Sequence, residues 1–149
     1  MFQPPLAIMN IIMPDLSSVS APMSEAVTND IRVEVMSRYS PENSRPQQDE
    51  WVFQYTVRIT NQGAGTVQLL TRHWIITDAL DHIEEVQGPG VIGEQPVLGP
   101  GESFKYSSWC PLKTPMGMMH GTYQMVRTDG SQFDIAIAPF ALKARYTVN

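Results

Sequence analysis

A glycine- and proline-rich stretch near the middle of the chain carries the pattern most readily tied to ligand chemistry. Residues 88–101 contain five glycines and three prolines, and Gly88, Gly90 and Gly93 complete a G-x-G-x-x-G pattern. In dinucleotide-binding folds this pattern follows a strand and opens a helix, so that backbone N–H groups and the helix dipole meet a pyrophosphate. Here Pro96 and a second turn at 99–101 leave no room for a helical period. The stretch is therefore interpreted as a loop of a β-protein.

Two interpretations of this loop compete. In the first, its glycines permit positive φ or close packing and Pro89 stiffens the turn. In the second, successive N–H groups form a nest for a phosphate or pyrophosphate, with Arg72 or His73 supplying positive charge. The first is favoured, because the pattern is weak without a following helix. The second predicts ligand-binding residues that comprise Arg72, His73, Gly88, Gly90, Gly93, Glu94 and Gln95.

Metal-binding side chains are few. The three histidines are far apart and none shows an H-x-x-x-H spacing. Asp78 and Asp81, with Glu84 and Glu85, cluster around an expected hairpin and could hold Mg²⁺ or Co²⁺ weakly, although an acidic turn is more often only solvated. We therefore predict no cofactor and keep Asp78 and Asp81 as the alternative metal site.

Nucleophilic catalysis has little support in the sequence. Cys110 lies between Trp109 and Pro111 without a histidine nearby in the sequence, which favours a structural thiol. The serines at 107 and 108 are not part of a G-x-S-x-G elbow. We expect a protein that is not an enzyme.

Composition narrows the classes of partner. The formal net charge is −5 and charged residues make up 17%, with lysine and arginine dispersed along the chain. No basic patch is visible, so nucleic acid is disfavoured as a partner. The apolar start is broken by prolines and has no Lys or Arg before Arg32, which fits neither a signal peptide nor a membrane span. With only one cysteine, Cys110, we expect a soluble cytoplasmic protein without disulfides.

Alternating apolar and polar residues predict a chain of strands. The clearest alternation covers 51–60, a similar pattern covers 31–39, and Asp129-Gly130 between two alternating runs predicts a hairpin. A long run at 66–78 carries apolar residues on both parities, which predicts a bulge near Thr71. Seven or eight short strands without a helix predict an all-β fold, an antiparallel β-sandwich of the immunoglobulin or fibronectin-III type.

The expected domain boundary lies near residue 26. Residues 1–26 show no sustained period and are interpreted as a flexible N-terminal extension, and 27–149 as the sandwich. The segment at 110–121, with Pro111, Pro115 and Gly117, is expected to be irregular, and a separate short edge strand is expected after Pro139.

Several of these stretches together resemble the ApaG family. They are the run from Thr66 to Trp74 with Ile76-Thr77-Asp78, the loop from Glu85 to Pro96, the turn at 100–102 and the stretch Thr114-Pro115-Met116-Gly117. The resemblance covers about 27–142. It implies a fibronectin-III-like sandwich, a bacterial cytoplasmic setting and a family label of cobalt and magnesium efflux. It also implies relatives in which the domain is an interaction module, and no enzymatic activity.

These observations predict a non-catalytic binding module. Its loops at 88–96 and 111–119 would engage a protein partner or a small phosphate-bearing ligand, and Met116, Met118 and Met119 would suit an adaptable surface or fill the end of the core. The alternative is an accessory protein that binds divalent metal directly. The sequence leaves the oligomeric state open.

Overall fold

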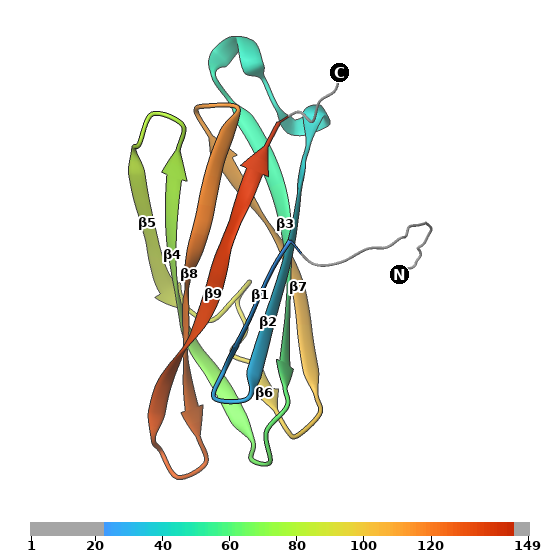
Figure 1. Ribbon diagram of the computed structural model, residues 1–149, viewed down its shortest axis with the longest axis vertical. Helices are drawn as coiled ribbons and strands as arrows, with labels where there is room; N and C mark the ends of the chain where they lie inside the picture. The colour runs from blue at the N-terminus through green and yellow to red at the C-terminus, as the bar shows by residue number, and fades with distance from the viewer. Residues whose placement is uncertain (1–22, 145–149) are drawn as a thin grey trace, which may run out of the picture.

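Two antiparallel sheets face each other in the computed structural model, which describes residues 23–144 (Figure 1). The first sheet has the order β1 (Ser24–Thr28), β2 (Ile31–Tyr39), β3 (Trp51–Asn61) and β7 (Ser103–Leu112). The second has the order β5 (Ile83–Pro89), β4 (Val67–Asp78), β8 (Met116–Arg127) and β9 (Gln132–Lys143), and the short β6 (Val97–Leu98) also pairs with β4. Two short 3-10 turns, η1 (Pro41–Asn43) and η2 (Pro46–Gln48), join β2 to β3. The fibronectin-III-like sandwich predicted from the sequence is confirmed.

Alternation along β3 explains why the two layers form. Phe53, Tyr55, Val57 and Ile59 are buried, whereas the residues that alternate with them are half-buried or exposed. The register sets Val57 beside Val35 of β2, so that apolar side chains of neighbouring strands share the inner face. Each fully buried side chain of this size stabilises the fold by about 1.5–3 kcal/mol relative to exposure. A slip of one residue would turn all of them outward, so this pattern fixes the register.

The bulge expected in the long run at 66–78 is present. The pairing of β4 with β8 shifts register between Leu69 and Thr71. Because of this shift Leu69 and Trp74, which differ in parity, both point into the core. The shift also turns Arg72 toward the inner face, where its partner on β5 is Gly88.

Two expectations about proline were wrong. The segment at 110–121 is not irregular, because β7 continues to Leu112 and β8 starts at Met116. Pro111 is opposite Val52 of β3. The Val52 N–H donates to the Ser44 hydroxyl and the Val52 carbonyl accepts from the Ser40 N–H, so Val52 forms no ladder hydrogen bond with Pro111. The missing N–H of proline is therefore tolerated at this position. Likewise β9 runs through Pro139 without a break, next to a register shift in its pairing with β8.

The first strand was missed by the sequence prediction. β1 begins at Ser24, before the expected domain start at residue 27, and pairs with β2 along its length. Its outward Val27 is exposed and its inward positions carry Ser24 and Ala26, so the usual apolar alternation is absent. The rest of the expected N-terminal extension, residues 1–22, lies outside the described residues.

The two sides of the sandwich differ. On one side β1 and β2 approach β9: the Ser37 hydroxyl donates to the carbonyl of Ala141 (2.9 Å) and the Ala136 N–H donates to Thr28 Oγ1 (3.2 Å). These bonds tie the two sheets together. On the other side the edges of β5 and β7 face each other, and no backbone hydrogen bond joins them within residues 23–144. The two sheets are therefore joined less tightly on the β5–β7 side.

Candidate functional site

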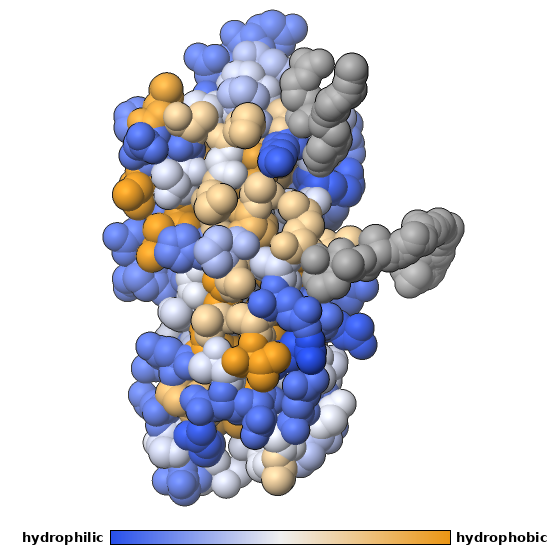
Figure 2. All heavy atoms as spheres, viewed as in Figure 1, coloured by the Kyte–Doolittle hydropathy of each residue, from blue (hydrophilic) through white to orange (hydrophobic). Residues whose placement is uncertain are grey.

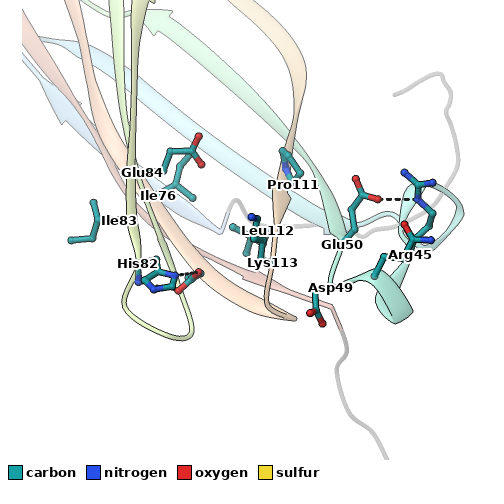
Figure 3. A pocket seen from close by; sticks show the side chains of 12 residues that line it. Arg45, Asp49, Glu50, Ile76, His82, Ile83, Glu84, Pro111, Leu112 and Lys113 are labelled. Atoms are coloured by element: carbon teal, nitrogen blue, oxygen red, sulfur yellow. Dashed lines mark hydrogen bonds and ion pairs between the residues drawn. The ribbon is translucent and has the colours of Figure 1, made fainter.

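A groove opens between the sheets where β5 and β7 diverge. Its outer part has a volume of about 610 Å³ and lies at the end of the sandwich that carries the β4–β5 turn and η2. Ile76 and Glu84 face Pro111 and Leu112 across it, as Figure 3 shows. The groove therefore has an apolar floor between two strand edges.

A second, smaller part continues the groove toward the core. It has a volume of about 200 Å³ and shares Ile76, Glu84 and Pro111 with the outer part, so the two adjoin. Its other lining residues come from both sheets: Tyr55, Arg72, Trp74, Val86, Ser108, Trp109, Cys110 and Met119. We call the outer and inner parts together the β5–β7 groove.

Trp74, which lines the inner part of the groove, has an unsatisfied donor. Trp74 is only 2% exposed, and its indole Nε1 has no hydrogen-bond partner among residues 23–144. The ring is held by edge contacts with Tyr55, Tyr123 and Phe140, at centroid distances of 5.2, 6.3 and 6.0 Å. A buried N–H without a partner costs free energy.

Charges around the groove are predominantly acidic. The outer part has four carboxylates and two cationic side chains, together with His82. Arg45 is already paired with Glu50 (2.9 Å). Asp78 caps the hairpin turn by accepting the N–H groups of Leu80 (2.8 Å) and His82 (3.0 Å). Desolvation raises the pKa of Asp78, but these two bonds and the interactions with the His82 side chain together outweigh it, so the pKa is lowered overall.

Glu84 differs from these carboxylates. No hydrogen bond or ion pair engages its side chain within the described part of the chain. The Glu84 carboxylate acts on Cys110 across the groove. The pKa of the Cys110 thiol is raised to about 12, first by burial and second by the negative charge of Glu84. Glu84 is thus an available negative charge on the β5 wall.

The glycine loop uses most of its polar groups internally. The N–H of Gly90 donates to Leu70 (2.8 Å), and Val91 and Glu94 exchange backbone bonds (2.8 and 2.9 Å). Arg72 Nη1 donates to the carbonyls of Pro89 (2.9 Å) and Gly90 (3.0 Å), so the arginine holds the loop in place. Residues 92 and 93 turn the chain with φ of 42° and 80°.

The structure brings together only some of the predicted ligand-binding residues. Arg72, His73 and Gly88 line a shallow polar depression of about 500 Å³, whereas Gly90, Gly93, Glu94 and Gln95 are not among its lining residues. His73 Nε2 lies 2.7 Å from Glu85 Oε1, and Gln95 donates to the Leu70 carbonyl (2.9 Å). Phosphate binding by this set stays a prediction.

The alternative metal site is not a ready-made cluster. Asp78 caps the turn, and Asp81 stands at its tip with φ of 64°. Within residues 23–144 no group of three or more His, Cys, Asp or Glu side chains could hold an ion. Weak Mg²⁺ or Co²⁺ binding by Asp78 and Asp81 also stays a prediction.

Comparison with known proteins identifies the family. The model of the ApaG domain matches residues 41–127, a span that runs from the η1 turn through β8 and includes both walls of the groove. The chain belongs to the ApaG family. The protein ApaG of Anaeromyxobacter dehalogenans strain 2CP-C is 54% identical over 127 residues, covering 85% of this chain and 100% of that protein. The protein ApaG of Bordetella pertussis is 51% identical over 120 residues, covering 80% of this chain and 92% of the relative.

A solved structure of an ApaG-family relative shows the same architecture. The crystal structure titled as the putative ApaA protein of Bordetella pertussis superposes with a TM-score of 0.77 at 52% identity, covering 79% of this chain and 96% of that one. No helix in the described range is long and apolar enough to cross a membrane.

The β5–β7 groove was missed by sequence reasoning. Its walls come from strands about twenty-five residues apart, so no local motif marks it. One signal could have pointed to the groove. Glu84 is paired with Ile76 of β4, so its side chain lies on the face of β5 that points toward the other sheet. A charged residue at an inward strand position indicates either a buried partner or an open edge.

Proposed function

We propose that this ApaG-family chain is a non-catalytic binding module of the bacterial cytoplasm whose β5–β7 groove engages a protein partner. The observation that carries this proposal is the groove itself, which reaches from an acidic rim to the Trp74 and Tyr55 side chains between the sheets. Ligand sites are concave and mostly apolar, with a few polar groups that fix orientation. The inner part of the β5–β7 groove, which is lined largely by aromatic and apolar side chains, fits that description.

The chemistry of the groove supports binding rather than catalysis. The thiol of Cys110 lines the inner part, but a pKa of about 12 leaves it protonated at neutral pH. Its burial and free state suit a reducing compartment. The association with cobalt and magnesium resistance or efflux, which the family resemblance implies, would then act through the partner.

Site-specific cross-linking in living cells tests the proposal. A photoreactive amino acid replaces Lys113, which lines the outer part of the groove, or Gln62, which is exposed at the opposite end of the sandwich. We expect a protein adduct from position 113 and none from position 62. Equal adducts from both positions, or none from position 113, would contradict the proposal.

A matched pair of substitutions makes the test specific for the groove. Ser108→Trp fills the inner part, whereas Ser107→Trp places the same side chain on the outer face of the same strand. The adduct should be lost with the first and kept with the second.

A second candidate is a phosphate-bearing ligand at the glycine loop. It is favoured by the polar depression in which Arg72 and His73 lie beside Gly88. Titration with inorganic phosphate or pyrophosphate should then move the amide resonances of residues 88–95. Unmoved resonances exclude this candidate and leave the groove proposal intact.

The direct metal-binding alternative has its own measurement. It predicts stoichiometric Co²⁺ or Mg²⁺ binding in calorimetry that is lost on changing Asp78 and Asp81 to asparagine. The partner-based proposal predicts no such heat.

A further inference from the structure

The walls of the groove are strand edges that lack a partner. In the described part of the chain β7 pairs only with β3, and β5 pairs only with β4. Each strand therefore presents a row of N–H and C=O groups toward the groove. Such an edge is a template for pairing with another chain.

The open edge of β7 can be assigned to particular residues. The N–H and C=O of Val52 bond to Ser44 and Ser40, so the Val52–Pro111 pair is not hydrogen-bonded. Bonded and non-bonded pairs alternate along an antiparallel ladder. Ser107 and Trp109 share the parity of Pro111, so their N–H and C=O groups point to the open edge.

The two edges differ in how they are protected. β5 carries Glu84 and Glu85 and ends in Pro89, features that discourage pairing. β7 carries Lys105 and Pro111, but the stretch between them has neither a charged residue nor a proline, and Trp109 within it is 48% exposed. The edge of β7 is thus the one left available.

A strand added beside β7 would extend the first sheet over the β5 wall. Its alternate side chains, two residues or about 7 Å apart, would point between the sheets. There they would meet the unpaired carboxylate of Glu84 and the half-buried Val86 near Trp74. A cationic side chain of the added strand would complement Glu84, and an aliphatic side chain would pack against Val86.

We propose that the β5–β7 groove binds an extended segment of a partner protein, which adds as a strand to the edge of β7 and places Lys or Arg against Glu84, with an aliphatic residue two positions away. This inference rests on the proposed function and names the chemistry of its partner. The excess of carboxylates around the outer part favours a basic segment over an acidic one. Main-chain bonds supply affinity and the alternate side chains supply specificity.

Selection from a random peptide library on the full chain tests the inference. We expect the enriched peptides to share a Lys or Arg and an aliphatic residue at positions i and i+2. Their binding is then measured by fluorescence anisotropy and mapped by amide resonances. Resonance changes should centre on Ser107, Trp109 and Val86.

Charge variants of β5 test the contact with Glu84. Glu84→Gln and Glu84→Lys should weaken the selected peptides, the latter by roughly tenfold or more. Glu85→Gln is the matched control, because this neighbouring carboxylate points to the outer face, where it contacts His73. Its effect should stay within about twofold. Thermal unfolding of each variant verifies that it is folded.

Backbone chemistry tests strand addition itself. Binding should slow hydrogen exchange at the Ser107 and Trp109 amides. Methylation of peptide nitrogens at alternate positions, those facing β7, should abolish binding, whereas methylation of the others should be tolerated.

Each other result overturns the inference in a recognisable way. Peptides that map to the groove but ignore Glu84→Lys exclude the cationic contact and leave the groove proposal standing. Peptides that bind elsewhere, or a selection without enrichment, exclude an extended segment as the occupant. In that case a cross-link from position 113 would still support the proposed function with a folded partner surface.

Discussion

At the scale of single residues, Gly121 decides how closely two strands approach. It pairs with Trp74 beside the irregularity in β8, and a Cβ added there would collide with the carbonyl oxygen of His73 and lie 3.2 Å from Trp74 Cα. Both obstacles are backbone and cannot rotate away. We expect Gly121→Ala to lower the free energy of unfolding by about 1–3 kcal/mol in urea denaturation. Gly65→Ala is the control, because an added Cβ there meets nothing within 4 Å. Equal midpoints for the two variants would contradict this account.

Cys110 should be an unreactive thiol. Its side chain is 2% exposed, and burial with the nearby Glu84 charge raises its pKa to about 12 from an ordinary 9.0. At pH 8 the thiolate fraction is then roughly a thousandfold below that of an ordinary cysteine. Iodoacetamide labelling, followed by mass spectrometry, should be slow in the native protein and fast in 6 M guanidinium. Rapid native labelling would show that the inner part of the groove opens freely to solvent.

The sequence located part of the candidate site at the residue scale. Arg72 and His73 were predicted to lie near the glycine loop, and both line a depression with Gly88. The sequence could not show that Arg72 donates to the loop carbonyls, because that contact depends on the bulge after Leu69. Glu84 was noted only as part of an acidic cluster. Its availability follows from an open sheet edge, which is a property of strand order rather than of local sequence.

At the scale of elements, the β8–β9 hairpin illustrates a turn held by one carboxylate. Asp129 accepts hydrogen bonds from the hydroxyl (2.7 Å) and the N–H (2.9 Å) of Ser131, and these bonds lower its pKa below the ordinary 3.8. A depressed folded pKa means that its contribution to stability is present above pH 3.8 and is lost as the pH falls through the folded value.

Acid should therefore loosen this hairpin before the sandwich unfolds. We expect the Ser131 amide resonance and its hydrogen-exchange protection to change as the pH is lowered below about 4. Asp129→Asn keeps a hydrogen-bond acceptor but does not titrate, so the same amide should lose this pH dependence. An identical pH profile in the variant would show that another group governs the turn.

The accuracy of the sequence prediction also varied by element. Strands with one apolar face, such as β2 and β3, were predicted with their faces correct, because alternation reports burial on one side. The Asp129-Gly130 turn was predicted because Asp-Gly between two alternating runs can adopt positive φ, and Gly130 does so with a φ of 87°. Elements that pair at sheet edges were missed or cut short: β1 lacks large inward residues, and proline interrupted the expected β7 and β9. Edge strands tolerate small inward residues because less burial is required there, and they tolerate proline because one side of the strand forms no ladder hydrogen bonds.

At the scale of the whole molecule, the sandwich is closed on one side and open on the other. Apolar residues also reach the surface on the second sheet, where Leu80, Ile83, Met116 and Met118 are exposed near the end that carries the groove. Orange spheres gather on the upper part of this face in Figure 2. Met119, predicted with Met116 and Met118 to suit a partner surface or to fill the core, is buried. A partner bound in the groove would thus find an adaptable apolar surface beside it.

This asymmetry should be measurable in the free protein by hydrogen exchange. The Ala136 amide on the closed side donates to Thr28 Oγ1 across the sheets, whereas the Ser107 and Trp109 amides on the open side face the groove. We expect slow exchange at Ala136 and fast exchange at the other two. Thr28→Val removes the acceptor and should speed exchange at Ala136 by roughly two- to tenfold. Thr60→Val, in the same sheet as Thr28 but on β3, where its hydroxyl contacts Ser103, is the control and should leave Ala136 unchanged. If the Ala136 amide exchanged as fast as the amides of Ser107 and Trp109, the hydrogen bonds on the β9 side would not hold the two sheets together. The β5–β7 side would then not differ from the β9 side.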